Sequence, residues 1–582
     1  MSPQSSLSLD QRFAALPRYA KREFVPDGAD LTDVETVKNL YDRLLERPLV
    51  SAATLELWLK DRAELETVLD QAGSLLYIKM TCQTDNEAYA KAYEAFIQNV
   101  IPAAEPLGDA LNKKYLNICG RLNWNSRDFE VYTKAIRTDV ELFRPDNVPL
   151  QTDIQMLSQE YQKTVGAMMV NYDGKEQTLP QMSKYIYETD RHVREETWRL
   201  TAKRRLQDAQ KLDDIFDKML KLRNQVALNA GFKNFIDYKF KSLHRFDYSP
   251  QECCQYHASI KEFLVPLYRE ILQRRRQQMK LDVLRPWDTA VDPLGRPPLK
   301  PFAKSEELIE GCRKIFDRVD PELGVQFREM SSMGLLDLDS RKGKAPGGYQ
   351  SALSEARKPF IFMNAVGTDD DVRTLLHEGG HAFHAFAAAH YLLPAYRHAP
   401  MEFCEVASMT MELFGEKFLD EFYSDEERQR SAMTHLEGIV HTLIWVAIVD
   451  SFQHWIYQHP QHTQEERKGA WLKTQKDFSA EIINWDGLER EKEYLWHRQL
   501  HIFEVPFYYI EYGIAQLGAL QLWLKSKKDF KSTIGDYCRA LALGGSQSLP
   551  KLFEAAGLTF DFSERTIQPL AKSLSTEIEF FR

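Results

Sequence analysis

The sequence has few cysteines, no excess of positive charge and no long hydrophobic run. Its 582 residues include seven cysteines, and no two of them form a Cys-x-x-Cys pair. A thiolate zinc cluster is therefore not expected, and so few cysteines in so long a chain are typical of a reduced cytoplasmic protein. Residues 1–26 also lack the continuous apolar stretch of a signal peptide. We expect a soluble protein of the cytoplasm.

Charge and hydropathy argue against two kinds of partner. Asp and Glu number 85 against 75 Lys and Arg, which gives a net charge of −10. Nucleic-acid binding needs a basic surface that displaces counterions from phosphates, so we expect no nucleic-acid partner. The longest apolar stretch, residues 438–449, is too short to cross a bilayer, so we expect no membrane partner. We assign no oligomeric state from the sequence.

The regular patterns that are present predict a mainly α protein. Apolar residues recur at three- and four-residue spacing over long windows, such as residues 55–69 and 212–228. Two segments predict strands instead. Residues 167–179 indicate a β-hairpin with Asp173-Gly174 at its turn, and residues 359–366 indicate a short apolar strand.

Chain length and punctuation suggest two parts. A chain this long fits two to four domains or one large two-lobed body. Prolines crowd residues 285–301, which therefore cannot form a continuous helix. We expect an N-terminal helical lobe over residues 1–190 and a catalytic lobe over residues 191–582.

The strongest chemical signal is the H-E-x-x-H motif that begins at His377 and ends at His381. Residues four apart on a helix lie one turn above each other, so both imidazoles can bind one metal ion. Glu378 lies near enough to contact a water molecule at the metal without being a ligand. The helix is expected over residues 372–391, with Thr368 as its N-cap and Asp371 at the capping-box position.

The two glycines inside this motif need an explanation. Gly379 and Gly380 each cost about 1 kcal/mol relative to Ala in a helix. We therefore expect a strand, a neighbouring helix or a substrate to approach this face closely.

A third ligand is expected from a later helix, since a catalytic zinc takes three protein ligands and keeps one position for water. Residues 401–414 supply three candidates, Glu402, Glu405 and Glu412. Glu405 and Glu412 are seven residues apart and hence share a face. Carboxylates among so many apolar residues are costly to bury unless a metal or a ligating histidine compensates them.

A late aromatic segment offers neutral hydrogen-bond donors. His501 is followed by Tyr508, Tyr509 and Tyr512. Such donors can stabilise the oxyanion of a tetrahedral intermediate, although an aromatic run at this spacing is also common in a hydrophobic core.

Together these segments resemble the M3 family of zinc oligopeptidases, and in particular its oligoendopeptidase F-like branch. The resemblance runs over most of the chain. It is carried by the hairpin and by the following segments: GKAPGGY from Gly343, PFIFMN from Pro359, HEGGHAFH from His377, FCEVAS from Phe403 and HIFEVPFYYIEYG from His501.

The resemblance implies a fold and a set of roles. The fold is two mostly helical lobes flanking a deep active-site channel, with a small β-sheet beside the zinc-binding helix. Glu405 becomes the third ligand, with His377 and His381, of one Zn²⁺ per chain. Glu412 lies behind the ligands. Glu378, His501 and Tyr508 are the expected catalytic residues. Peptide-binding roles fall on a flexible loop, an edge strand that pairs with the substrate, and two tyrosines: Gly347, Gly348, Tyr349, Phe360, Phe362, Asn364, Tyr509 and Tyr512.

The expected activity is zinc-dependent hydrolysis of internal bonds in short, unstructured peptides. A zinc carboxypeptidase or aminopeptidase is the alternative within enzymes, since the sequence alone does not locate a charge that would bind a peptide terminus. A peptide-binding scaffold with a structural zinc is the alternative outside enzymes. The intact H-E-x-x-H argues against it, because a structural site has four protein ligands and no such base.

Overall fold

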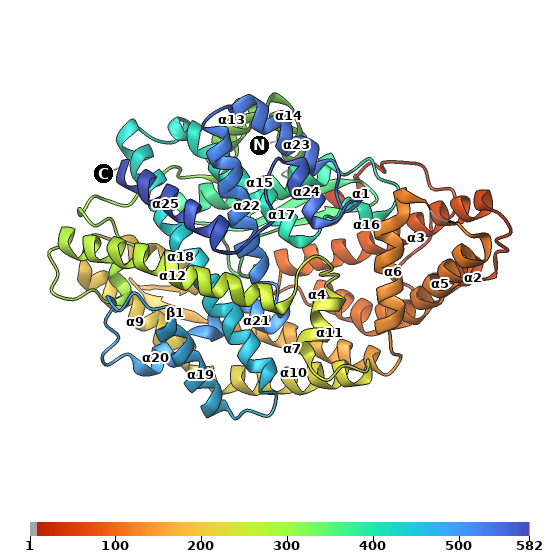
Figure 1. Ribbon diagram of the computed structural model, residues 1–582, viewed down its shortest axis with the longest axis horizontal. Helices are drawn as coiled ribbons and strands as arrows, with labels where there is room; N and C mark the ends of the chain where they lie inside the picture. The colour runs from red at the N-terminus through yellow and green to blue at the C-terminus, as the bar shows by residue number, and fades with distance from the viewer. Residues whose placement is uncertain (1–7, 125, 581–582) are drawn as a thin grey trace.

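The structure, a computed structural model, describes residues 8–124 and 126–580 and is mainly helical, as predicted. Figure 1 shows an arm of N-terminal helices at one end of an elongated molecule, joined to a larger body. The helices of the N-terminal part are α1 (Leu9–Ala14), α2 (Val34–Glu46), α3 (Ala52–Cys82), α4 (Glu87–Ala95), α5 (Ile101–Leu122), α6 (Glu130–Leu142) and α7 (Asn147–Gly166).

The body contains the remaining long helices. They are α9 (Arg191–Gln207), α10 (Ala209–Asn229), α11 (Phe235–Ser242), α12 (Pro250–Gln278), α13 (Ser305–Val319), α14 (Pro321–Ser332), α15 (Asp369–Ala387), α17 (Met401–Gly415), α18 (Asp425–Gln458), α19 (Gln464–Asp477), α22 (Ile510–Ser526), α23 (Phe530–Leu541) and α25 (Glu564–Phe580). Shorter ones are α8 (Leu179–Ser183), α16 (Pro394–Arg397), α20 (Glu489–Glu493), α21 (Leu500–Glu504) and α24 (Leu549–Ala555). Between residues 285 and 301 only the short turn Pro286–Asp288 is helical, as the prolines predict.

Two large hydrophobic cores and one small cluster, formed by Leu272, Leu284 and Ala480, contain most of the buried apolar residues of the described chain. The smaller core belongs to the N-terminal helices, runs from Phe24 to Ile136 and is joined by two residues near α16. The larger core begins with Leu9 in α1 and takes in nearly everything from Leu142 onward. Helix α3 contributes to both cores, with Trp58 in the first and Ile78 in the second. The predicted boundary at residue 190 stays a prediction.

The two predicted strand regions form two small sheets. Strands β1 (Met169–Tyr172) and β2 (Lys175–Thr178) make the predicted antiparallel hairpin. Asp173 and Gly174 at its turn both have positive φ, which is the geometry of a tight two-residue hairpin turn.

The second sheet lies beside α15 and has the order β3-β5-β4. Strand β5 (Lys358–Ala365) pairs in parallel with β3 (Leu336–Asp339) and antiparallel with β4 (Tyr349–Leu353). The prediction that this aromatic segment is an edge strand is therefore wrong, because neighbouring strands occupy both of its sides. Its run of apolar residues is what a strand buried on both faces requires.

Helix α15 begins as the sequence predicts. Asp371 accepts hydrogen bonds from the backbone amides of Val366, Gly367 and Thr368 and from the Thr368 hydroxyl. The helix ends at Ala387, so the expected extension to residue 391 is wrong.

The motif glycines allow two close contacts. A Cβ placed on Gly380 would lie 2.6 Å from the Ala407 carbonyl oxygen and from the Ser408 Cα in α17. A Cβ on Gly379 would lie 2.5 Å from the ring of Phe316. Of the three expected partners, a neighbouring helix is the one that approaches most tightly, and this contact sets the separation of α15 and α17.

Gly380→Ala is expected to lower the free energy of unfolding by about 1–3 kcal/mol, because the new methyl group meets rigid backbone and must push the two helices apart. Urea unfolding followed by circular dichroism measures this change. Gly108→Ala in α5 is the control, since its Cβ meets nothing within 4 Å. That variant should gain about 0.5–1 kcal/mol from helix propensity. Equal stability of the Gly380 variant and the wild type would contradict the close approach.

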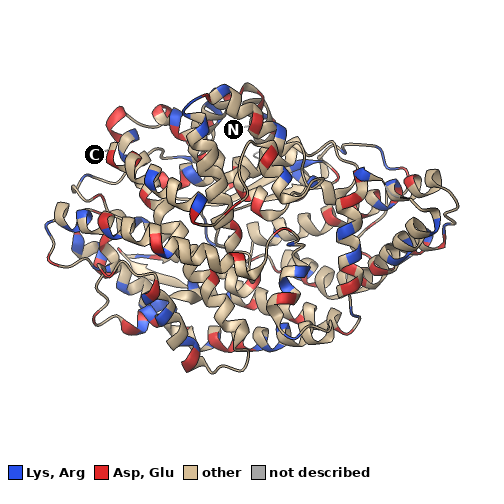
Figure 2. Ribbon diagram, viewed as in Figure 1, with Lys and Arg blue, Asp and Glu red and all other residues tan. Residues whose placement is uncertain are grey.

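In Figure 2, acidic and basic residues are interspersed along the helices of the face shown. All seven cysteines lie within the described residues and are free thiols. One described helix, α18, is long and apolar enough to span a membrane by length and composition, and 56% of its most apolar window is buried inside the protein.

Candidate metal centre

Three predicted ligands converge between α15 and α17. The Nε2 atoms of His377 and His381 each lie 3.4 Å from the Glu405 Oε2 oxygen. The three side chains each offer one ligand atom, all within 4.8 Å of one another. Of the other two glutamates that the sequence left open, Glu402 accepts a hydrogen bond from the Tyr248 hydroxyl instead. Glu405 is therefore the carboxylate that faces both histidines.

Glu412 lies behind the ligands, as expected. Its Oε1 oxygen is 2.7 Å from His377 Nδ1, and its Oε2 oxygen is 3.1 Å from His435 Nε2. Burial opposes its ionisation, but the hydrogen bonds from both histidines lower the pKa of Glu412 to about 2. A carboxylate that holds the Nδ1 proton leaves His377 Nε2 free as a metal ligand.

His435 and Glu416 extend this support, and the sequence analysis missed both. His435 Nδ1 lies 3.1 Å from the Glu416 Oε2 oxygen. His435 belongs to α18, far along the chain from the motif, so no local spacing could have indicated it.

Glu378 is buried beside the three ligands. Its side-chain Oε2 oxygen has no hydrogen-bond partner among the described residues, and burial raises the pKa of this carboxyl group. Gly348 lies close by, because a Cβ atom added to this glycine would lie 3.7 Å from the Glu378 Oε1 oxygen. A buried carboxylate with an unsatisfied oxygen is costly, and a cation with its water molecule would compensate it. The residues present therefore fit a metal ion.

Tyr508 contacts the proposed third ligand directly. Its hydroxyl group donates a hydrogen bond of 2.7 Å to the Glu405 Oε1 oxygen. The ring lies 5.6 Å from that of His501 in α21. Both residues thus lie beside the centre, as the resemblance implies.

The tautomer of His501 follows from its neighbours. Trp445 Nε1 donates to the Gln499 Oε1 oxygen, which orients the amide so that Gln499 Nε2 donates to His501 Nδ1. His501 Nε2 then carries the proton and donates to the Tyr512 hydroxyl at 3.1 Å. Burial lowers the pKa of His501 to about 4, so the ring is a neutral donor at neutral pH.

Tyr509 has different surroundings from the other two tyrosines. Burial raises the pKa of its hydroxyl to about 12, and the groups that act against this shift are Arg498, Trp445 and Gln499. By contrast, the charges of Glu405 and Glu378 both act on Tyr512. The Tyr509 ring also packs against His501, with 5.0 Å between ring centroids. The two tyrosines therefore differ in what their hydroxyls contact: His501 for Tyr512, and Trp445 and Gln499 for Tyr509.

The loop before β4 adjoins Glu378. Asn364 Nδ2 donates to the carbonyl oxygens of Ala345 and Gly347, at 2.9 and 2.8 Å. Gly347 has φ +92, a conformation that favours glycine. These hydrogen bonds hold Gly348 beside the Glu378 carboxyl group.

Two of the aromatic residues expected to bind substrate are fully buried, and a third is fixed in a strand. Phe360 and Phe362 are 0% exposed, so their side chains cannot touch a peptide. Tyr349 belongs to strand β4, stacks on Phe362 and hydrogen-bonds to the Thr81 hydroxyl. The expectation of a flexible loop at Tyr349 is therefore wrong, because sheet pairing and stacking fix this residue.

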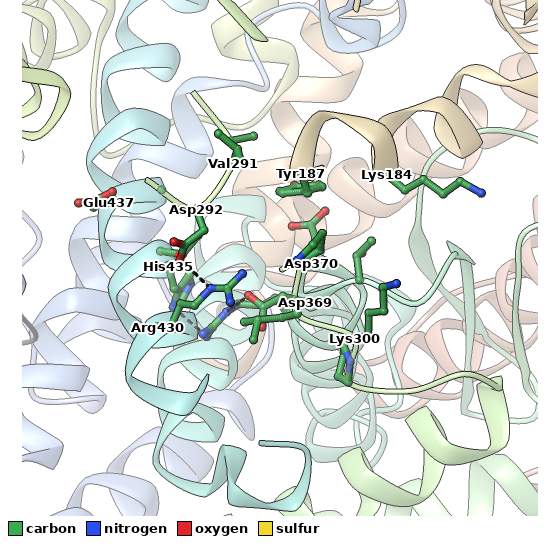
Figure 3. A pocket seen from close by; sticks show the side chains of 18 of the residues that line it. Lys184, Tyr187, Val291, Asp292, Lys300, Asp369, Asp370, Arg430, His435 and Glu437 are labelled. Carbon is green, nitrogen blue, oxygen red and sulfur yellow. Dashed lines mark hydrogen bonds and ion pairs between the residues drawn. The ribbon is translucent and has the colours of Figure 1, made fainter. Parts of the chain in front are cut away.

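A cavity of about 1060 Å³ adjoins the centre through Glu412. Figure 3 shows the residues that face it: Asp369 and Asp370 from the start of α15, Arg430 and His435 from α18, and Tyr187 from the opposite wall. Neither the three converging side chains nor Glu378 line it, so the cavity lies behind the candidate metal centre, on the side of Glu412 and His435.

A helical fold that brings the two histidines of H-E-x-x-H and a later glutamate to one point is characteristic of a metallopeptidase. The chain matches peptidase family M3 over residues 184–571 and the peptidase M3 N-terminal domain over residues 29–143. It belongs to peptidase family M3, within the oligoendopeptidase F-like branch, and this family membership implies a metal cofactor.

Curated proteins similar to this chain carry oligopeptidase names. The chain is 25% identical over 302 residues to oligopeptidase PepF of Bacillus subtilis, which is 50% of this chain and 44% of that protein. It is 23% identical over 297 residues to an oligoendopeptidase F homolog of Borreliella burgdorferi, 49% of this chain and 48% of that protein. The chain thus spans about half the length of these curated relatives.

Solved structures match over far more of the chain. A structure of PZ peptidase A with an inhibitor has a TM-score of 0.90 and 27% identity, covering 96% of this chain and 99% of that one. Oligoendopeptidase-F from Enterococcus faecium shares the fold with a TM-score of 0.62 and 15% identity, over 95% of this chain and 96% of that one.

Proposed function

We propose that the protein is a zinc-dependent endopeptidase that cleaves short, unstructured peptides. The observation that carries the proposal is the convergence of His377, His381 and Glu405 on one point, with Glu378 beside them and one of its oxygens unpaired. The names of the M3 relatives and the inhibitor-bound structure support the same activity.

Zinc suits this ligand set. Two imidazoles and one carboxylate are ligands of catalytic zinc, and three protein ligands leave a position for water. When bound, zinc supplies a Lewis acid that polarises the peptide carbonyl and lowers the pKa of a water molecule toward about 7.

Glu378 carries the proton in this proposal. As a carboxylate it takes the proton of the attacking water, and it then delivers that proton to the leaving amine. Burial raises the pKa of Glu378, which brings the group closer to the neutral pH at which it must both accept and donate.

His501 and the tyrosines beside it act on the carbonyl oxygen as it gains charge. The neutral Nε2–H of His501 and the hydroxyl of Tyr508 are the donors, and Tyr512 receives the His501 bond in the absence of substrate. Tyr508 reaches the substrate by exchanging its bond to Glu405 for one to the developing oxyanion.

Tyr508→Phe is expected to lower kcat by about 10²–10³ with little change in metal content, since one donor to the oxyanion is lost. Steady-state kinetics with an internally quenched peptide measures the change. Tyr89→Phe is the control and should change kcat by less than about threefold, because its hydroxyl donates to Asp10 in the N-terminal part of the chain and touches none of the proposed catalytic residues. Equal losses in both variants would remove Tyr508 from this role.

The same experiment can test the activity itself. The peptide has about ten residues and is blocked at both ends, and mass spectrometry identifies the products with and without a chelator. Internal cleavage that the chelator abolishes supports the endopeptidase. Cleavage of unblocked peptides only would favour the carboxypeptidase or aminopeptidase, and no cleavage with metal bound would favour the peptide-binding scaffold. Efficient digestion of a stable folded protein would contradict the proposed substrate class.

The proposal includes a domain division and a cellular location. The division into an N-terminal lobe, residues 1–190, and a catalytic lobe, residues 191–582, assigns all the proposed metal ligands to the second lobe. A cytoplasmic location is supported by the seven free thiols, which a reducing compartment preserves.

A further inference from the structure

A second cluster of metal-binding side chains lies between α12 and α18, apart from the centre described above. These two helices pack against each other in the body of the protein, where α18 crosses behind α12 in Figure 1. Cys253 and His257 lie four residues apart on α12, and Asp450 and His454 lie four residues apart on α18. Each pair therefore projects from one face of its helix toward the other pair.

The four side chains meet at close range. Ligand atoms of Cys253, Asp450 and His454 lie within 4.8 Å of one another. His257 Nε2 is 2.8 Å from the Asp450 Oδ2 oxygen, and His454 Nε2 is 3.3 Å from the same oxygen.

The cluster is deeply buried and incompletely paired. Cys253 and Asp450 are 0% exposed, and the two histidines are also buried. The second carboxylate oxygen of Asp450, Oδ1, has no hydrogen-bond partner among the described residues. An unsatisfied oxygen on a buried carboxylate is costly, so this atom indicates a missing partner.

Arg245 does not supply that partner. Arg245 lies close enough for its charge to act on Cys253, but its guanidinium group pairs with Glu511 and Glu402. One divalent cation would balance the site instead. When the cation binds, the Cys253 thiol releases its proton to solvent. The resulting thiolate and the Asp450 carboxylate then supply two negative charges, and the two imidazoles are neutral ligands.

We propose that Cys253, His257, Asp450 and His454 form a structural zinc site. Three of them already lie within reach of one ion, and His257 becomes the fourth ligand by exchanging its hydrogen bond to Asp450 for the metal. Four protein ligands that include a thiolate and imidazoles are typical of structural zinc, whereas Mg²⁺ and Ca²⁺ prefer sites with oxygen ligands only.

A metal ion at this site would stabilise the segment that carries Phe507 and the proposed catalytic Tyr508. The His454 ring packs edge-on against Phe507 at 5.2 Å, and the Gln453 side-chain oxygen accepts a hydrogen bond from the Phe507 amide. Phe507 has φ +66, an unfavourable conformation for a non-glycine residue that its surroundings must maintain. Tyr508 comes next in the chain, so these contacts from α18 help to position its backbone.

The test counts metal ions and detects the thiolate ligand. Purified protein is dialysed and its zinc is measured by mass spectrometry. We expect about two equivalents per chain in the wild type and about one in Cys253→Ser. Cys254→Ser is the matched control, because that cysteine is the next residue on the same helix and is exposed. It should keep both equivalents.

Cobalt substitution gives a second measurement that does not depend on the Cys253 variant folding. A His377→Ala, His381→Ala double variant removes two ligands of the first centre, whose ligand set contains no sulfur. Cobalt bound to this variant should still produce a thiolate-to-cobalt charge-transfer band in the near ultraviolet. A wild type that binds one equivalent and a double variant without the band would overturn the second site, and neither result bears on the peptidase activity.

Discussion

Glu378→Gln is expected to lower kcat for peptide hydrolysis by about 10²–10⁴ while leaving the metal content unchanged. The amide has nearly the same shape as the carboxyl group but cannot accept the proton of the attacking water. Since Glu378 is not among the three converging ligands, the centre itself remains intact. Steady-state kinetics with a blocked peptide and metal analysis by mass spectrometry measure the two quantities.

Glu378→Asp provides the control for this result. It keeps a carboxylate but withdraws it by one methylene group, so its kcat should lie between those of the wild type and the Gln variant. A Gln variant with near wild-type kcat would show that another group moves the proton. A Gln variant without metal would show instead that Glu378 is a ligand.

His381→Ala should have the larger effect on the centre itself. With one of three ligands gone, we expect the metal count to fall by one equivalent and peptide hydrolysis to drop to background.

Glu412→Gln should be milder than His381→Ala, at about 10–100-fold in metal affinity or activity, because Glu412 orients His377 without joining the three ligands.

His390 provides the control for His381→Ala. His390 lies just beyond the end of α15, is exposed and faces the Ala387 carbonyl oxygen. His390→Ala should keep the wild-type metal count and activity. If both variants lose metal equally, the effect comes from the helix and not from the ligand.

The parts of the site that the sequence predicted depend on local geometry. His377 and His381 follow from helical spacing, and Thr368 and Asp371 mark the helix start that puts them on one face. Glu405 was separated from its neighbours only by resemblance, because all three glutamates share one helix. The contact that distinguishes it, to both histidines, depends on how α17 crosses α15 at Gly380.

What the sequence did not predict depends on pairing between distant segments. An apolar strand can be an edge strand or a central one, and only the order of β3 and β4 around β5 decides which. The sequence analysis did not predict the cluster at Cys253, for the same reason. Its two pairs are each spaced four apart, but they lie on helices about 200 residues apart in sequence, and no single motif joins them.

Helix α3 connects the N-terminal arm to the loop beside the candidate metal centre. It has 31 residues and is therefore about 46 Å long, with Trp58 in the small core and Ile78 in the large one. Near its C-terminal end, Thr81 bonds to the Tyr349 hydroxyl at the start of β4, the residue after Gly348. Gln71 in this helix bonds to the amides of Glu355 and Ala356, which makes this point the natural pivot. A tilt of about 5° about it moves the Thr81 end, about 15 Å away, by about 1 Å. A contact on the distant arm, far from any catalytic group, can therefore shift the backbone beside Glu378.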